Sequence, residues 1–472
     1  MHRIGGELAK NEDACFGRNQ ARFRPNPGKN RRRDKKSLER PLYRLDFAGT
    51  GGLQILAIRA REYDRYSLVK QPKAKPGWRK RSSPSASPLF KLTTMQTLRP
   101  LSLLTLTALA LQPLAAHADL TVKIGQVSPL TGELSHIGKD DENGVRLAIE
   151  DLNSRKIRIN GQSVTFVLDS QDDAADPKTA VTVAQKLIDD GVAGVVGHAN
   201  SGTSIPASKI YSDAGVPMIT ESATNPKLTQ QGFTNVFRMV ANDVRQGTVI
   251  GTYLVHDLGA RKIAIVDDRT AYGQGLADEV EKAVKAAGGN VVAREYGTDK
   301  TTNWMAILTT IKSRQPDGIA FTGGDTQAAA FVQQAQKLGL KVKFVAGDEA
   351  CTPQFIKLAG ASMSSDTYCT LAGVPPAKMP QGPEFFKRYE QRFGVPVQLY
   401  APYAYDAVIA IANAMQAAGS TDPKAYLPKL RAAKLDGVTG PIQFDEKGDI
   451  RNGAITVRQF DQGNWTDRSV VR

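Results

Sequence analysis

Two short hydroxyl-rich turns are the part of this 472-residue sequence best suited to binding chemistry. They are Ser201-Gly202-Thr203-Ser204 and Ser222-Ala223-Thr224. Each follows an apolar run typical of a buried parallel strand, residues 192–196 and 216–219. The first turn also opens a helix, whose free N–H groups would face the space beyond the strand ends. Side by side at the carboxyl edge of a sheet, the turns predict a site for a small carboxylate. The alternative is that Ser201 and Thr224 only cap helices.

Alternating strands and helices must position these turns. A first series of predicted strands covers residues 120–127, 164–168, 192–196 and 216–219, with helical patterns between them. A second series covers residues 262–266, 291–296, 318–321 and 343–346. Such alternation implies right-handed crossovers and parallel sheets covered on both faces. We therefore predict an α/β fold class with two Rossmann-like lobes, each built on a parallel central sheet.

The chain is expected to pass between the lobes three times. After residue 372 come helices at 384–393, 404–418 and 426–433 and then a β-like end, which we interpret as a return to the first lobe. Crossings near Met239, Ala372 and Gln459 would form a three-segment hinge that permits closure. The predicted domains are lobe 1, residues 119–240 plus 373–455, and lobe 2, residues 241–372 plus 456–472.

The sequence before residue 119 has a different character. Residues 1–94 carry 23 Lys and Arg against 8 Asp and Glu, a net charge of +15 that equals the charge of the whole chain. We expect a disordered basic leader, arising from a start codon assigned too early, so the high pI does not indicate nucleic-acid binding. Residues 95–118 have the short basic start, apolar centre and Ala116-His117-Ala118 end of an export signal peptide. The predicted localisation is the periplasm.

Only two of the three cysteines, Cys351 and Cys369, follow the predicted export signal; Cys15 lies in the leader. A cysteine pair in an oxidising compartment is most simply a disulfide. We expect that bond to contribute roughly 3 kcal/mol.

Catalysis finds little support in the sequence. His136, His198 and His256 lie in no nucleophile elbow or zinc-helix motif. Asp172-Asp173 could be a metal pair, but two acids before a helix usually cap it or face solvent. We therefore expect no enzyme activity, no metal and no cofactor.

Binding of a zwitterion fits the sequence better. Ser201 and Thr224 would donate to a carboxylate, and an acid at a strand end of the second lobe would accept from an ammonium group. The candidate acids are Asp348, Glu349 and Asp325. Tyr272 could close over an apolar side chain and Tyr403 could line the pocket wall, although both could instead be core residues.

The sequence from residue 119 resembles the periplasmic leucine/isoleucine/valine-binding proteins of ABC transporters, which have the type I periplasmic-binding fold. The motifs that carry the resemblance are Ile124-Gly125, Leu130-Thr131-Gly132, Asn143-Gly144-Val145-Arg146-Leu147-Ala148, Val196-Gly197-His198, Pro217-Met218-Ile219-Thr220, Ala223-Thr224-Asn225-Pro226, Ala271-Tyr272-Gly273-Gln274-Gly275 and Gly347-Asp348. They recur in order over nearly all of residues 119–472.

The resemblance implies an amino-acid clamp. Its positions match Ser201, Ser222, Thr224 and Tyr272, and an acid of the Gly347-Asp348-Glu349 turn would reach the ammonium; which of the two acids does so stays open. This chain departs from some members at His136-Ile137 and Asp325, where they have aromatic residues, so the side-chain preference is also open.

Taken together, these observations predict a monomeric periplasmic binding protein that captures a branched-chain or related amino acid and delivers it to an ABC permease. The alternative is a ligand sensor or binder for amides, urea or aromatic acids with the same fold. An exported hydrolase is a third reading, disfavoured because no nucleophile–base pair is evident.

Overall fold

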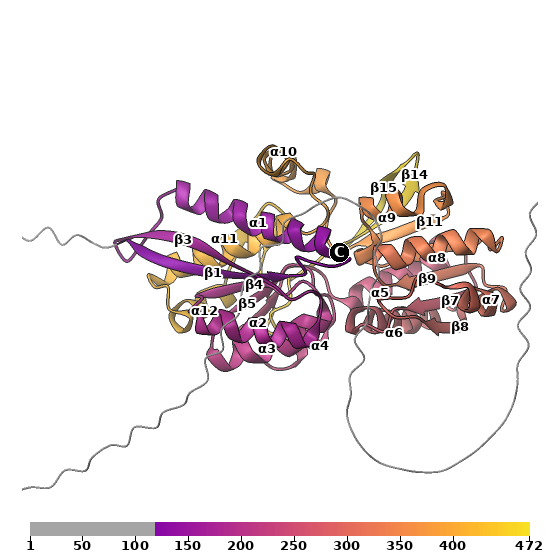
Figure 1. Ribbon diagram of the computed structural model, residues 1–472, viewed down its shortest axis with the longest axis horizontal. Helices are drawn as coiled ribbons and strands as arrows, with labels where there is room; N and C mark the ends of the chain where they lie inside the picture. The colour runs from indigo at the N-terminus through magenta and orange to yellow at the C-terminus, as the bar shows by residue number, and fades with distance from the viewer. Residues whose placement is uncertain (1–118) are drawn as a thin grey trace, which may run out of the picture. The chain divides into compact units, whose positions relative to one another are not determined.

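The computed structural model describes residues 119–472, which form two α/β lobes built around one main sheet each (Figure 1). The predicted basic leader and export signal lie outside the described residues. No helix of the described region is long and apolar enough to cross a bilayer.

The first lobe contains a six-stranded sheet in the order β2-β3-β1-β4-β5-β6. Its strands are β1 (Leu120–Ser128), β2 (Arg158–Ile159), β3 (Gln162–Asp172), β4 (Gly194–Gly197), β5 (Met218–Thr220) and β6 (Val236–Arg238). All neighbours are parallel except the short β2, which is antiparallel to β3. Helices α1 (Ser135–Ser154) and α11 (Ala401–Ala418) pack together, as do α2 (Pro177–Asp189) and α3 (Ser201–Ala214) (Figure 1). The four strands predicted for this lobe are confirmed.

The second lobe contains a seven-stranded sheet in the order β15-β14-β11-β10-β9-β7-β8. The parallel strands are β7 (Lys262–Asp267), β8 (Asn290–Tyr296), β9 (Gly318–Thr322), β10 (Lys343–Ala346) and β11 (Thr367–Leu371). At one edge, β14 (Ile455–Asp461) and β15 (Asn464–Val471) run antiparallel. The sequence predicted a β-like end but did not separate it into the strands β14 and β15.

Alternation of side chains along β7 shows why this sheet needs helices on both faces. Ile263 and Ile265 contribute to one apolar core with α5 (Asp243–Thr252) and α6 (Ala271–Ala286). Ala264 and Val266 contribute to another with α7 (Met305–Ser313), α8 (Asp325–Lys337) and α9 (Pro353–Ala359). A period of two with both sets apolar is typical of a strand buried on both faces.

The chain passes between the sheets after β6, after β11 and before β14. The first two passages agree with the crossings expected near Met239 and Ala372. The third was expected near Gln459, but Gln459 already pairs with Tyr368 inside the second sheet, so this crossing precedes Ile455. Helices α10 (Gly382–Phe393) and α12 (Pro423–Arg431) and the small β12 (Leu435–Asp436)–β13 (Pro441–Ile442) hairpin lie between the second and third crossings.

Cys351 and Cys369 are joined as a disulfide, with 5.3 Å between their Cα atoms and a sequence separation of 18. Both are buried, Cys351 just after a short 3-10 turn and Cys369 within β11. The bond therefore links the segment that follows β10 to the neighbouring strand.

We expect replacement of both cysteines by serine to lower the free energy of unfolding by about 3 kcal/mol, because the unfolded chain regains loop entropy. Urea unfolding with and without reductant would measure this. Reductant should weaken the natural chain and leave the double variant unaffected; equal stability of the two proteins without reductant would contradict the expectation.

Candidate functional site

A cleft lies where the carboxyl ends of the strands of both lobes meet. Its inner part is lined by the residues Pro129, Leu134, Ile137, Ala199, Asn200, Ser201, Ser222, Ala223, Thr224, Tyr272, Asp348, Glu349 and Tyr400. Six of the eight residues predicted for the site are in this set. The location follows the general rule that loops after parallel strands build the ligand sites of α/β folds.

The two hydroxyl-rich turns lie side by side on the first lobe. The Ser201 hydroxyl accepts a hydrogen bond from the Asn225 backbone N–H at 3.1 Å, and the Ser222 hydroxyl donates to the Ala199 carbonyl at 2.8 Å. These two hydrogen bonds connect the loop after β4 to the loop after β5. The Thr224 hydroxyl is buried and has no hydrogen-bond partner among the residues that the structure describes. Of the hydroxyls in the two turns it is therefore the one without a hydrogen-bond partner of good geometry, although it lies close enough to the Asp243 carboxyl to lower the pKa of that group.

Neither Ser201 nor Thr224 serves as a helix cap. The cap residue of α3 is Asn200, whose side chain makes no capping bond, and Ser201 is already inside the helix. The short helix α4 (Lys227–Gln230) starts after Pro226, with the Asn225 side chain accepting from Lys227 N. The capping alternative is thus removed for both hydroxyls.

On the facing side, Asp348 gathers three donors. Its Oδ1 accepts from the Tyr272 hydroxyl at 2.8 Å and from the Gln246 amide, and its Oδ2 accepts from the Tyr400 hydroxyl. Burial raises the pKa of Asp348, while the bonds from Tyr400, Tyr272 and Gln246 oppose that rise. Tyr272 is the second residue of α6, which packs on the second sheet, and Tyr400 directly precedes α11, which packs on the first sheet. The Asp348 carboxylate therefore connects elements of both lobes.

Glu349 is the more open of the two neighbouring acids. It is half-buried, whereas Asp348 is 2% exposed. Its Oε1 accepts from the Asn200 amide of the first lobe at 3.1 Å. Burial, followed by the charges of Asp268, Asp348 and Asp325, raises the pKa of Glu349 well above its ordinary value. A cation placed beside it would relieve this unfavourable environment.

The other two predicted residues lie outside the inner lining. Asp325 is fully buried at the start of α8, where it lies 2.9 Å from His136 Nε2 and accepts from the Thr352 hydroxyl at 2.7 Å. It thereby joins the two lobes rather than facing the cavity. Tyr403 is also buried, and it lines a separate cavity at the hinge, beside Gly373.

Sequence reasoning missed Tyr400, Asn200 and the apolar wall of Pro129, Leu134 and Ile137. Asn200 directly precedes Ser201, and the apolar wall follows the first strand at the same sheet edge, so position alone could have indicated them. Tyr400 precedes an apolar helix and lies 52 residues beyond Asp348, the acid that it contacts, and no local pattern marks that contact.

Asp172 and Asp173, the candidate metal pair, make hydrogen bonds to other residues of the first lobe. Asp172 accepts from the backbone N–H groups of Leu130 and Ala174, while Asp173 lies 2.8 Å from His198 Nδ1. Among residues 119–472, no group of three or more His, Cys, Asp or Glu side chains is arranged to hold a metal ion.

The cleft consists of two adjoining cavities of different size. The inner cavity measures about 30 Å³, and a chamber of about 450 Å³ adjoins it, with Leu134, Asn200, Tyr272 and Glu349 shared by both linings. A water molecule needs about 10–15 Å³ on the same measure. A molecule larger than one or two waters would therefore enter the inner cavity only as the facing side chains move apart.

Asp243, the first residue of α5, lies behind the threonine turn and donates its backbone N–H to the Thr224 carbonyl at 2.9 Å. Its carboxyl group is fully buried, and neither oxygen has a hydrogen-bond partner within the described part of the chain. Burial is the main cause that raises the pKa of Asp243 to about 8. The native protein therefore holds this group protonated at neutral pH.

This predicts that Asp243 makes the protein less stable as the pH rises. The unfolded chain has an aspartate pKa near 3.9, so the native state holds the proton more tightly and the free energy of unfolding falls between about pH 4 and pH 8. Asp243→Asn should raise the melting temperature at pH 8 by about 2 °C or more, and by much less at pH 5. Equal destabilisation by Asp243→Asn at both pH values would show that the ionised carboxylate is required.

Comparisons with known proteins agree with this architecture. The family model described as periplasmic binding protein matches residues 121–464. The chain is 33% identical over 350 residues to a Leu/Ile/Val-binding protein homolog 1 of Brucella melitensis, covering 74% of this chain and 92% of that protein. It is 32% identical over 360 residues to an amino acid binding protein of Pseudomonas aeruginosa, covering 76% and 95%.

Solved structures give the same result. A leucine binding protein LivK of Thermotoga maritima aligns with a TM-score of 0.68 at 27% identity, covering 74% of this chain and 98% of that one. The branched-chain amino acid transporter substrate binding protein LivJ of Streptococcus pneumoniae, solved in complex with isoleucine, aligns with a TM-score of 0.68 at 27% identity, covering 74% and 99%. On the match of the family model and the extent of these similarities, the chain belongs to the periplasmic binding protein family.

Proposed function

We propose that this protein is the extracytoplasmic binding protein of an ABC transporter, which captures a branched-chain or related amino acid between its lobes and delivers it to a permease. The single observation that carries the proposal is that a Thr224 hydroxyl without a hydrogen-bond partner in residues 119–472 lies across one cleft from a half-buried acid, Glu349. A free amino acid offers one negative and one positive group, which suit these two sides. Relatives named for leucine, isoleucine and valine support the same ligand class.

The carboxylate of the ligand would bond the first lobe. The Thr224 hydroxyl and the adjoining backbone N–H groups supply donors, and a bond to a charged group contributes more than one between neutral groups. Ser201 and Ser222 contribute chiefly by holding the two turns in register, since their hydroxyls already make bonds within the protein.

Of the two neighbouring acids, Glu349 is the one that we assign to the ammonium in this proposal. Asp348 has both oxygens occupied by Tyr272, Gln246 and Tyr400, whereas Glu349 Oε1 accepts only from the Asn200 amide among the residues that the structure describes. Asp348 would then orient the two tyrosines around the ligand. The wall of Pro129, Leu134 and Ile137 suits an aliphatic side chain.

Thr224→Ala tests the carboxylate contact. Because the hydroxyl has no partner within the described residues, its removal should leave the melting temperature of the empty protein within about 2 °C. Calorimetric titration should show L-leucine binding about 10- to 100-fold more weakly, the loss expected for one bond to a charged group. Unchanged affinity in a well-folded variant would place the ligand elsewhere. Urea, amides and benzoate, titrated in parallel, test the other ligand classes.

Glu349→Gln tests the ammonium contact. The natural protein should discriminate L-leucine from 4-methylpentanoate, which lacks the amino group, and the variant should lose about tenfold or more of that ratio. Asp348→Asn is the matched control and should lower stability while retaining most of the discrimination. If only Asp348→Asn reduces the ratio, the two acids have the opposite roles.

A further inference from the structure

Arg238 is a fully buried cation at the end of β6, outside the cleft lining. Its Nη1 donates to the backbone carbonyls of Ala223 at 2.7 Å and of Asn225 at 2.9 Å. These two carbonyls flank Thr224 on either side. The guanidinium therefore binds the main chain of the threonine turn immediately before and immediately after Thr224, the residue that lines the cleft.

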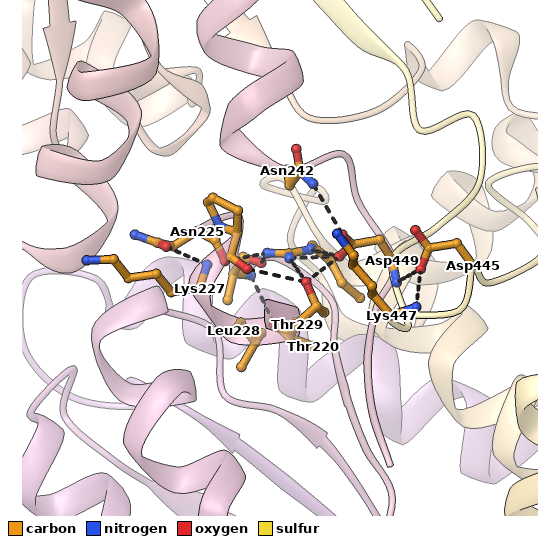
Figure 2. Close-up of polar contacts among 12 residues, drawn as sticks. Thr220, Asn225, Lys227, Leu228, Thr229, Asn242, Asp445, Lys447 and Asp449 are labelled. Carbon is orange, nitrogen blue, oxygen red and sulfur yellow. Dashed lines mark hydrogen bonds and ion pairs between the residues drawn. The ribbon is translucent and has the colours of Figure 1, made fainter. Parts of the chain in front are cut away.

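The charge of Arg238 is matched by Asp449, which belongs to the segment that leads into the third crossing between the lobes. Asp449 Oδ1 accepts from Arg238 Nε at 2.8 Å and from Nη2 at 2.7 Å, and the Thr229 hydroxyl lies 3.0 Å from the same oxygen. Figure 2 shows dashed contacts that connect Asp449 with Thr229 and Asn242. The main chains also meet, because Arg238 N donates to the Gly448 carbonyl at 2.9 Å.

The loop that carries Asp449 is itself rigidly built. Asp445 Oδ1 accepts from the backbone N–H groups of Lys447 and Asp449, both at 2.9 Å (Figure 2). Gly448 has a φ of +96°, and a Cβ there would lie 2.1 Å from the Val236 carbonyl oxygen, so only glycine fits against β6. The acid is thus fixed relative to the strand.

Asp449 also touches the first crossing. Its Oδ2 accepts from the Asn242 side-chain amide at 3.2 Å, and Asn242 is the cap residue of α5, the first helix of the second lobe. The next residue, Asp243, donates its N–H to the Thr224 carbonyl at 2.9 Å. One ion pair therefore contacts the ligand-facing turn, the first crossing and the third crossing at once.

We propose that Arg238 and Asp449 are positioning residues that hold the Thr224 turn in its ligand-binding geometry and tie that turn to two of the three hinge segments. A fixed guanidinium suits this role, because its planar donors can bond two carbonyls and a carboxylate in one arrangement, which the single ammonium of lysine cannot reproduce. The inference rests on the proposed function, since it assigns a part in amino-acid binding to residues that do not touch the ligand.

The test is a double-mutant cycle with L-leucine as the probe, measured by calorimetric titration of the full chain. Asp449→Asn should weaken binding about tenfold, within the usual range for coupled sites. If Asp449 acts through the Thr224 turn, adding Asp449→Asn to Thr224→Ala should weaken binding by less than about twofold more, because the contact that it positions is already gone. Additive losses would show general destabilisation and overturn the proposal.

Asp151→Asn is the matched control. Asp151 accepts from Arg388 at 2.6 and 2.7 Å in the same lobe, and its side chain is 18% exposed against 16% for Asp449. This variant should leave the affinity for L-leucine unchanged even where it lowers the melting temperature. An equal loss of affinity in Asp151→Asn would contradict a specific role for the Arg238–Asp449 pair.

If Asp449→Asn does not fold, Thr229→Val removes one hydroxyl from the same cluster and should weaken binding about threefold. Unchanged affinity in Thr229→Val would then overturn the inference.

Two further outcomes separate this inference from the proposed function. If Thr224→Ala itself leaves the affinity unchanged, the proposed site fails. If Thr224→Ala weakens binding and Asp449→Asn does not, only the positioning role fails.

Discussion

A carboxylate removed from water must be matched by hydrogen-bond donors, and at Asp348 this requirement draws the two lobes together. Tyr272 and Gln246 come from helices of the second lobe, while Tyr400 precedes α11, which packs with α1 on the first sheet. The hydroxyls that satisfy Asp348 belong to the rings that line the cleft. The placement of one buried charge thus fixes the position of two aromatic walls.

Behind the opposite wall of the cleft, which carries Thr224, the buried group is a cation, and it likewise needs hydrogen-bond partners. Arg238 is a buried cation, and its donors are used up by two main-chain carbonyls, one hydroxyl and Asp449. Each wall of the cleft is therefore supported from behind by a buried charge whose bonding groups are occupied. Within residues 119–472, Thr224 Oγ1 on one side has no hydrogen-bond partner of good geometry, and Glu349 on the other side is half-buried; under the proposed function a zwitterion would bond both.

Much of this arrangement could be predicted from the sequence because it depends on local pattern. Apolar runs ending in polar turns predicted the parallel strands. They placed Ser201, Ser222 and Thr224 at the carboxyl edge of the first sheet, and Tyr272 and the acids at that of the second. Asp325 shares that signal, since it also follows a strand, but its side chain turns to His136 and Thr352 instead. Whether a residue at the right edge points into the cleft depends on packing, which a strand-end pattern does not encode. Tyr400 and Asp449 act on partners far away in sequence, so their roles became visible only in three dimensions.

The central claim is that a free amino acid is held by its charged groups between Thr224 and Glu349. It is tested most directly by a crystal structure of the protein grown with L-leucine. We predict density for leucine in the inner cleft, with its carboxylate within hydrogen-bond distance of the Thr224 hydroxyl, its ammonium beside Glu349 and its side chain against Leu134 and Ile137. Leucine bound with its carboxylate directed to the second lobe, or density only in the outer chamber or at the hinge, would contradict this claim.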